Sequence, residues 1–404
     1  MKRHVLQFPV AFLILALAVV TAAAQKKYDP GASDEAIKIG NTNPYSGPAS
    51  AYGLIGRTIA AYFTKVNAEG GVNGRKINFI SYDDGYSPPK TVEQARKLVE
   101  RDEVLLIFAS LGTAANSAIE RYMNSKQVPQ LFVATGATKF GDPKNFPWTM
   151  GWQPTYQSEG RVYAKFLVQN YPNGKIGVLY QNDDYGKDYL KGLKDGLAGQ
   201  IPIVSEQAYE VTDATVNSQV ISLQGARADV FFNVTTPKFA AQAIRKVAEL
   251  GWKPVHLLNN VASSVGSVLQ PAGLENAVGV LSTQYIKDLT DPAWKDDLAF
   301  KEWLAFMEKY FPDGDRTSSL TVTGYALGHT IATVLKQCGD DLTRANVMKQ
   351  ATSLKDLANP MLLPGVTINT GPNDYFPIKQ MRMGRFSGEH WELFGPVLSG
   401  EIGS

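Results

Sequence analysis

Cysteine is nearly absent from this sequence, since Cys338 is the only one among 404 residues. A single cysteine cannot form an internal disulfide, and it cannot supply the thiolates that a Cys-based metal site needs. We interpret it as a buried, inert thiol near the end of a helix predicted over residues 321–337. The hydrophobic fraction of 44% is high enough for two domains with separate cores.

The sequence also lacks an excess of charge of either sign. It contains 40 Lys and Arg residues and 38 Asp and Glu residues. Lys2 and Arg3 lie in a predicted signal peptide, and without them the two signs balance. A balanced chain has no electrostatic basis for binding nucleic acid or anionic lipid, so we expect neither as a partner.

Catalytic sequence motifs are missing as well. There is no G-x-S-x-G, no H-E-x-x-H, no G-x-x-x-x-G-K-[ST], and no G-x-G-x-x-G after the first predicted strand. His256, His329 and His390 are far apart in sequence and are predicted to be ordinary packed or surface residues. We therefore expect no enzymatic mechanism, no metal ion and no cofactor.

Two acidic pairs, Asp83-Asp84 and Asp183-Asp184, have the composition of a metal site or of a general acid and base. Their neighbours are Tyr, Gly and Ser rather than further ligands. We favour a role in capping or in the polarity of a hinge.

The only long apolar run lies at the start of the chain. Lys2 and Arg3 precede the run Val10 to Val20, and small residues lead to Ala24. This pattern predicts a secretory signal peptide over residues 1–24, cleaved after Ala24. The alternative, a retained membrane anchor, is disfavoured because the run is too short to span a bilayer well. We therefore expect an exported protein.

Strands alternate with amphipathic helices through most of the remaining sequence. Buried strands are predicted over residues 37–40, 76–82, 104–108 and 128–133 and again, after a break near Trp148 and Trp152, over residues 175–180, 201–208, 229–234 and 254–258. This alternation predicts an α/β fold with parallel sheets covered by helices on both faces. Two consecutive sets of the same units predict two similar lobes rather than one large sheet.

Two glycine turns follow successive strands of the first set. They are Phe108-Ala-Ser-Leu-Gly-Thr-Ala-Ala-Asn116 and Phe132-Val-Ala-Thr-Gly-Ala-Thr138. The first leads into a helix, whose free backbone N–H groups form a receptacle for a carboxylate. The alternative is plain N-capping by Ser110 and Thr113. Two such turns at the carboxyl ends of strands, where open α/β sheets bind ligands, favour a binding site.

The order and spacing of several motifs resemble one protein family. These motifs are Tyr45-Ser-Gly-Pro-Ala-Ser-Ala-Tyr-Gly53, Gly70-Gly-Val-Asn-Gly74 followed by Tyr82-Asp-Asp84, and Asp183-Asp-Tyr-Gly186 after a strand. The chain is similar, from about Ile37 to Gly395, to the leucine/isoleucine/valine-binding type of periplasmic solute-binding protein. The resemblance implies the type I fold, in which two Rossmann-like lobes are joined by a three-segment hinge. The expected boundaries are residues 36–153 and 285–364 for lobe 1, and 154–284 and 365–396 for lobe 2.

The resemblance also implies a set of ligand contacts. Carried over by position, they are Tyr52, Gly112, Thr113, Gly136 and Thr138 in lobe 1, and Tyr185, Thr235 and Asn260 in lobe 2. In the family the lobe 1 positions hold the carboxylate and part of the ammonium of the ligand. The ring of Tyr185 is expected to cover an apolar ligand body, and the alternative for this residue is packing at the hinge.

Departures from the family pattern bear on the ligand. The acid that neutralises an ammonium in the family is replaced by Asn260, and an expected tyrosine is replaced by Thr235. Tyr86 and Leu111 occupy the positions of the family's disulfide. These departures favour a carboxylate or another hydrogen-bonding head on a hydrophobic, even aromatic, body. Asp183 or Asp184 remains a candidate to replace the acid, so amino acids remain among the candidate ligands.

The function expected from the sequence is that of a periplasmic solute-binding protein of a branched-chain amino acid-type ABC importer. The ligand is expected to be a small hydrophobic amino acid or an aromatic or aliphatic carboxylate, bound by hinge closure. The partner is expected to be an inner-membrane ABC permease, and the protein a monomer. The alternatives are a ligand-sensing module for a membrane receptor and, less favoured, a secreted enzyme.

Overall fold

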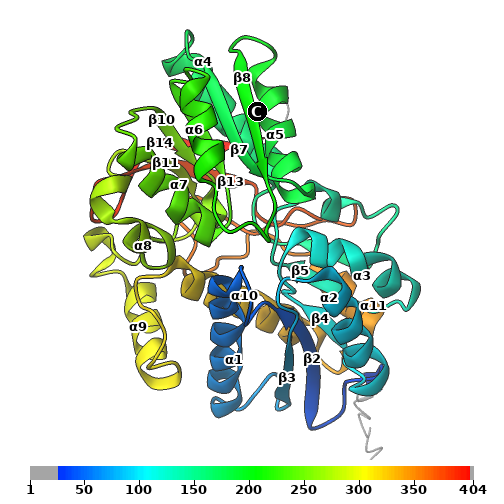
Figure 1. The fold of residues 1–404 in the computed structure, drawn as a ribbon. Coiled ribbons are helices and arrows are strands. Elements are labelled where there is room, and N and C mark those ends of the chain that lie inside the picture. The colour runs from blue at the N-terminus through cyan, green and yellow to red at the C-terminus, as the bar shows by residue number, and fades with distance from the viewer. Residues whose placement is uncertain (1–25, 401–404) are drawn as a thin grey trace, which may run out of the picture.

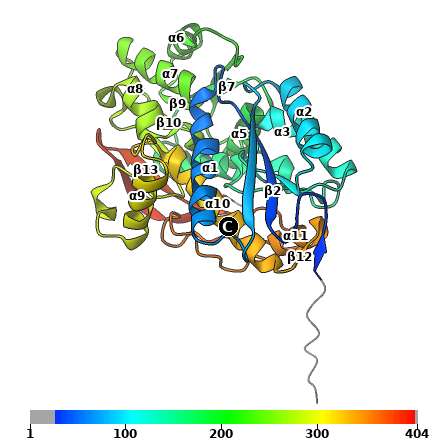
Figure 2. The same ribbon diagram turned by 90° about the horizontal axis from the view of Figure 1, so that it is seen from below.

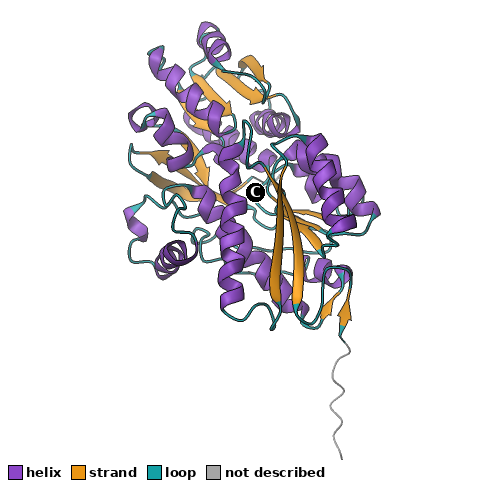
Figure 3. Ribbon diagram, turned by 60° about the horizontal axis from the view of Figure 1, so that its bottom comes forward, coloured by secondary structure: helices purple, strands orange, loops and turns teal. Residues whose placement is uncertain are grey.

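The computed structural model describes residues 26–400, which form two lobes, each built on its own β-sheet (Figure 1). The predicted signal peptide, residues 1–24, lies outside the described residues. Helices enclose both sheets, as Figure 3 shows. Within the described residues, no helix is both long and apolar enough to cross a membrane.

The first lobe is organised around a five-stranded parallel sheet. Its strands lie in the order β3-β2-β4-β5-β6, and β4 is central and completely buried. Their bounds are β2 (Ala36–Asn43), β3 (Lys76–Asp83), β4 (Leu106–Phe108), β5 (Gln130–Val133) and β6 (Thr149–Gly151). Because all five strands are parallel, their carboxyl ends meet at one edge of the sheet.

Helices from two distant parts of the chain cover this sheet. The first group comprises η1 (Ser50–Tyr52), α1 (Gly53–Ala68), α2 (Pro88–Arg96), η2 (Lys97–Arg101), α3 (Thr113–Ser125) and η3 (Thr138–Gly141). The second group comprises η7 (Pro292–Trp294), α9 (Leu298–Tyr310), α10 (Ser319–Cys338) and α11 (Arg344–Ala351). Helix α10 packs along α1, as Figure 2 shows, so this later part of the chain lies against the first lobe. A short parallel pair, β1 (Lys27–Tyr28) and β12 (Asp341–Leu342), ties down the start of the described chain.

The second lobe contains a seven-stranded mixed sheet in the order β14-β13-β11-β10-β9-β7-β8. The parallel strands are β7 (Ile176–Gln181), β8 (Ile203–Tyr209), β9 (Val230–Val234), β10 (Val255–Leu258) and β11 (Leu281–Gln284). The antiparallel edge consists of β13 (Gln380–Phe386) and β14 (Trp391–Ser399). Its helices are α4 (Tyr156–Asn170), α5 (Asp184–Leu197), α6 (Asn217–Gly225), α7 (Pro237–Glu249) and α8 (Gln270–Ala272), with the short turns η4 (Asn260–Ala262), η5 (Val265–Leu269) and η6 (Leu274–Ala277).

Helices α4 and α5 approach each other closely because of a glycine on α5. A Cβ atom on Gly192 would lie 2.4 Å from the carbonyl oxygen of Gln157 on α4. Tyr156 on α4 and Tyr189 on α5 consequently stack, with ring centroids 4.4 Å apart. This contact packs α4 against α5 within the second lobe.

Three segments connect the lobes. The first joins β6 to α4 through Gln153. The second follows β11, and the third precedes β13. The second segment pairs with the chain near residue 362, since Lys287 N–H donates to Met361 O and Leu363 N–H donates to Tyr285 O, both at 2.9 Å.

The predicted start of the last lobe 2 segment, at residue 365, is too early. Thr370 Oγ1 donates to Ala351 O, Tyr375 Oη donates to Pro147 O, and Ile368 pairs with Leu357, so these residues still contact lobe 1. The pairing of Ile368 with Leu357 is an isolated bridge rather than part of a strand. We therefore propose that the third crossing lies just before Gln380, where β13 begins.

Candidate ligand-binding cleft

An internal cavity lies where the two lobes meet. Its space, including the part open to solvent, is about 660 Å³. Both lobes and two of the connecting segments contribute to its wall. The lining residues are Tyr52, Ile55, Tyr86, Leu111, Gly112, Thr113, Ala134, Gln153, Tyr156, Tyr185, Thr236, Asn260, Val261, Ser263, Gln284, Tyr285, Ile286, Ser319, Leu320 and Thr323.

The lining contains polar groups but no ionisable acid or base other than tyrosine. None of the lining residues is Asp, Glu, His, Lys, Arg or Cys. The wall therefore provides hydroxyl, amide and backbone groups, but no carboxylate to neutralise a cation and no ordinary general base.

The start of α3 presents free backbone donors at this cavity. Gly112 is the N-cap residue, and no side chain accepts a hydrogen bond from the first turn. Within the described chain, the N–H groups of Thr113 and Ala114 have no acceptor. The positive end of the helix dipole and these donors suit a carboxylate.

The alternative of capping by Ser110 or Thr113 is not what the structure shows. Ser110 Oγ accepts hydrogen bonds from the N–H and the hydroxyl of Thr42. The Thr113 hydroxyl pairs with that of Thr135 at 2.7 Å. Both side chains are thus engaged away from the helix start, which leaves its amides to a ligand.

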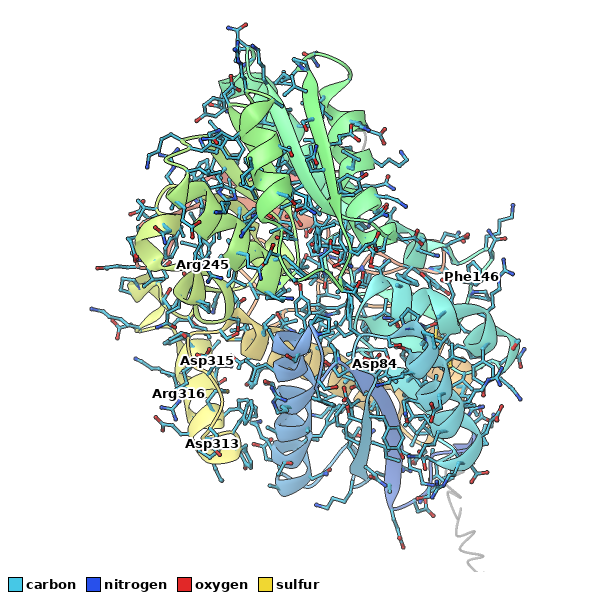
Figure 4. All side chains as sticks on the ribbon, viewed as in Figure 1. Asp84, Phe146, Arg245, Asp313, Asp315 and Arg316 are labelled. Atoms are coloured by element: carbon cyan, nitrogen blue, oxygen red, sulfur yellow. The ribbon has the colours of Figure 1, made fainter. Side chains whose placement is uncertain are left out.

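Gly112 is required at the helix start for two reasons. Its φ of +98° lies in the region that residues with a side chain rarely adopt. A Cβ atom there would also lie 2.7 Å from the ring of Tyr86. Tyr86 is held in turn by Asp84, whose carboxylate accepts from Tyr86 N–H at 3.0 Å and from the Thr91 hydroxyl at 2.8 Å. Figure 4 shows Asp84 at the side of the first lobe that faces the second.

Five tyrosine rings dominate the wall. They are Tyr52, Tyr86, Tyr156, Tyr185 and Tyr285. Burial raises the pKa of each phenol above its ordinary value, so all five remain protonated at neutral pH. The cavity therefore offers flat apolar faces whose hydroxyls are neutral hydrogen-bonding groups.

The hydroxyl of Tyr185 is oriented by a neighbour outside the cavity. Asn259 Nδ2 donates to Tyr185 Oη at 2.7 Å, which leaves the phenolic hydrogen free to donate to a ligand. The ring of Tyr185 meets that of Tyr156 edge to face at 5.3 Å. Tyr185 thus both packs at the lobe interface and lines the cavity.

Asn260 is positioned by a buried acid that lies behind the wall. Its backbone N–H donates to Glu159 Oε1 at 2.7 Å, and its side-chain amide donates to Thr283 O. The Glu159 carboxyl also accepts from Tyr163 and Tyr189. Burial raises the pKa of Glu159 to about 7, although these hydrogen bonds oppose the shift. Glu159 does not line the cavity, so it does not replace the missing acid there.

Asp183 and Asp184, the other candidates for that role, also lie outside the lining. Asp183 Oδ1 caps α5 by accepting from the N–H groups of Tyr185 and Gly186, and Oδ2 accepts from Gln181. Asp184 is exposed and lies 3.5 Å from Lys139 Nζ. Asp83 likewise accepts four hydrogen bonds from its own and a neighbouring turn. The acidic pairs therefore organise turns, as the sequence indicated.

Five of the eight predicted contact residues line the cavity, and three do not. Tyr52, Gly112, Thr113, Tyr185 and Asn260 are part of its wall.

Gly136, Thr138 and Thr235 are not part of the cavity wall, and their contacts lie elsewhere. Gly136 lies against Tyr156, whose ring would be 2.7 Å from a Cβ atom at position 136. Thr138 donates its N–H and hydroxyl to Asp188. Thr235 is buried and bonded to Asn233 and Asn259, and its neighbour Thr236 lines the cavity instead.

Several lining residues were not found from the sequence. Tyr86 and Leu111 stand at the positions of the family's disulfide, and the loss of that disulfide was the one signal that these positions have another use. Gln284 ends β11 and Tyr285 follows it, and the sequence pattern did not reveal this strand. Ser319 and Thr323 come from α10, which the sequence placed in lobe 1 but not at the site.

Comparisons with known proteins agree with this architecture. Residues 36–390 match the periplasmic binding protein family. The chain is 24% identical over 227 residues to the leucine-specific-binding protein of Salmonella typhimurium, a match that covers 55% of this chain and 60% of that protein. The chain thus spans less than two thirds of that relative's length.

Two solved structures illustrate the shared fold. One is described as a branched chain amino acid ABC transporter from Thermus thermophilus with bound valine, with a TM-score of 0.82, 15% identity, and coverage of 90% of this chain and 97% of that one. The other is described as the solute binding protein of an ABC transporter from Rhodopseudomonas palustris BisB5 in complex with 3,4-dihydroxy benzoic acid. It has a TM-score of 0.76, 19% identity, and coverage of 91% and 98%. Both likenesses show the fold of two Rossmann-like lobes joined by a hinge.

Proposed function

The chain belongs to the periplasmic binding protein family, and from this we propose that it is an exported solute-binding protein that delivers a small ligand to an ABC permease of the inner membrane. The relatives and structural neighbours are described as amino acid-binding or ABC-transporter proteins, which supports a transport role. We propose binding without turnover, because the cavity lining offers no ordinary general base.

The observation that carries the proposal is the cavity itself, in which the free amides at the start of α3 face a largely apolar, tyrosine-lined space. We propose that Gly112, Thr113 and their neighbouring amides hold a carboxylate, and that Tyr52 and Tyr185 cover the ligand body. Asn260 offers its side-chain oxygen as an acceptor, while its amide nitrogen donates one hydrogen bond to Thr283 O.

The ligand class is narrowed by the absence of a lining acid. The two structural neighbours hold valine, a hydrophobic amino acid, and 3,4-dihydroxy benzoic acid, an aromatic carboxylate. An ammonium enclosed against Asn260 would lose a charge-assisted partner, at a cost of about 1.5–3 kcal/mol. This cost corresponds to about a tenfold to hundredfold weaker affinity. We therefore favour amine-free carboxylates over α-amino acids.

Closure of the lobes is the proposed signal to the permease. Tyr52 Oη donates to Val261 O at 3.1 Å, a bond that joins the lobes beside the cavity. Such a bond forms only when the lobes meet, so ligand binding and closure stabilise each other.

A calorimetric comparison of paired ligands tests the proposal. Leucine and its deaminated analogue 4-methylpentanoate share a branched body and a carboxylate and differ in the ammonium. We expect the analogue to bind about tenfold or more tightly than leucine, and small-angle scattering to show a more compact protein with it. Tighter binding of leucine would overturn the preference for amine-free ligands. No binding and no compaction with any carboxylate would overturn the proposed function.

A further inference from the structure

Gln284 is a residue of the cavity wall, and its side-chain amide carries a buried donor that is not used within the described part of the chain. Gln284 is 4% exposed and lines the cavity. Its Nε2 atom has no hydrogen-bond partner in the described part of the chain. Buried amide donors in folded proteins are almost always paired, so an unpaired one in a binding cavity indicates a partner supplied by the ligand.

The surroundings of Gln284 show that this donor is held in place. Gln284 ends β11, where it is paired with Arg382 of β13. The neighbouring polar groups are already satisfied, because Thr283 N–H donates to Tyr163 and Thr283 O accepts from Asn260. The Gln284 amide therefore remains available for a ligand at this corner, beside the side-chain oxygen of Asn260.

Gln284 and the start of α3 belong to different lobes. Gln284 ends a strand of the second lobe at the second connecting segment, whereas Gly112 and Thr113 belong to the first lobe. A ligand that binds both is held by a carboxylate in one lobe and by a second polar group in the other. Such a ligand bridges the lobes and favours their closure.

The wall between these polar groups is aromatic. Five tyrosine rings line the cavity, and planar rings pack against such faces with edge or offset contacts. A ring hydroxyl matches the Gln284 amide well, because a hydroxyl accepts from the amide nitrogen and donates to the amide oxygen. A bare hydrocarbon ring would leave the buried amide unpaired.

We propose that the ligand is an aromatic carboxylate with a hydroxyl on its ring, and that Gln284 is the residue that selects this hydroxyl. This inference rests on the proposed function and specifies its substrate class. It assigns the recognition of the carboxylate to the start of α3 and the recognition of the ring substituent to Gln284.

The test compares benzoate with 3-hydroxybenzoate and 4-hydroxybenzoate by isothermal titration calorimetry. For the unmodified protein we expect the better hydroxybenzoate to bind about tenfold to hundredfold more tightly than benzoate. In Gln284→Met, which keeps a similar length without the amide, this ratio should fall to about one, because benzoate no longer leaves a buried amide unpaired and binds at least as tightly as before. Loss of the ratio with benzoate binding retained separates selection from general damage to the site.

Gln380→Met is the matched control. Gln380 also carries a buried amide atom without a partner, on the adjacent strand β13, but it does not line the cavity. Its replacement should preserve the hydroxybenzoate-to-benzoate ratio. Thermal unfolding of both variants shows whether they fold. If Gln284→Met does not fold, the ratio of hydroxybenzoate affinity to benzoate affinity in the unmodified protein still tests the inference.

Three results would overturn the inference. One is equal affinity of the unmodified protein for benzoate and both hydroxybenzoates, and another is an unchanged ratio in Gln284→Met. The third is binding of 4-methylpentanoate without binding of any ring compound, which leaves the proposed function standing. Failure of every carboxylate to bind would overturn the proposed function as well.

Discussion

Thr138 of the first lobe donates two hydrogen bonds to one carboxylate oxygen of Asp188 in the second lobe. The Thr138 N–H lies 2.8 Å and its hydroxyl 2.9 Å from Asp188 Oδ2. Gln157 Nε2 donates to the other oxygen at 2.6 Å. The amide and hydroxyl that the sequence assigned to the ligand's carboxylate thus hold a carboxylate of the protein itself, outside the cavity lining.

The contact between Thr138 and Asp188 allows lobe closure to be tested by a substitution outside the cavity wall. In Asp188→Ala the lobes lose two charge-assisted hydrogen bonds, so the open form gains population. We expect about tenfold weaker binding of 4-methylpentanoate and less compaction in small-angle scattering. Asp184→Ala is the control, because its exposed pair with Lys139 at 3.5 Å contributes little. Equal effects of the two variants would contradict the role of Asp188.

Tyr52→Phe should weaken ligand binding through the lobe contact. The variant keeps the ring in the cavity but removes the hydroxyl that donates to Val261 O. We expect a loss of affinity of about threefold to tenfold, the usual worth of one neutral hydrogen bond, measured by calorimetry. Tyr45→Phe removes a hydroxyl that pairs with Ser81 within lobe 1, and its affinity should match that of the unmodified protein. A fully retained affinity in Tyr52→Phe would rule out this contribution.

Gly112→Ala should damage the start of α3. The new Cβ would meet the Tyr86 ring at 2.7 Å, and the φ of +98° would strain any non-glycine residue. We expect a loss of stability of about 1–3 kcal/mol and more than tenfold weaker carboxylate binding. Gly225→Ala is the control, since no atom lies within 4 Å of its added Cβ, and alanine is the better helix former. Denaturant unfolding and calorimetry measure the two effects, and normal binding by Gly112→Ala would refute this assignment.

Glu159 should make the stability of the protein depend on pH. Its pKa is about 7 in the folded protein, raised by burial from an ordinary value of 4.5. The folded state therefore holds this proton more tightly than the unfolded state. Glu159 therefore contributes about 3 kcal/mol to the free energy of unfolding below about pH 4.5, and this contribution is lost as the pH rises toward 7.

Glu159→Gln imitates the protonated carboxyl and should flatten the pH dependence between pH 5 and pH 7. The free energy of unfolding, measured with denaturant across this range, provides the readout. Glu120 needs a parallel variant, because burial also raises its pKa to about 7. If Glu159→Gln retains the full slope while Glu120→Gln loses it, the dependence belongs to Glu120.

The sequence alone determined the repeating strand and helix units and their division into two lobes. These features follow from the spacing of apolar residues and from glycine turns, which act over a few neighbouring residues. The same local signals indicated the helix start at Gly112 and Thr113. The resemblance to the family placed Tyr52, Tyr185 and Asn260, all of which line the cavity.

Only the tertiary structure decided which groups remain free for a ligand. Thr138 is occupied by Asp188, 50 residues away, and Tyr52 bonds to Val261, 209 residues away. Gln284 acquires its place through the pairing of β11 with β13, which joins distant segments. Such contacts depend on how the two lobes pack against each other. Local sequence patterns do not encode this packing, because the hydrophobic spacing and turn residues of each lobe are the same whether or not the other lobe is present.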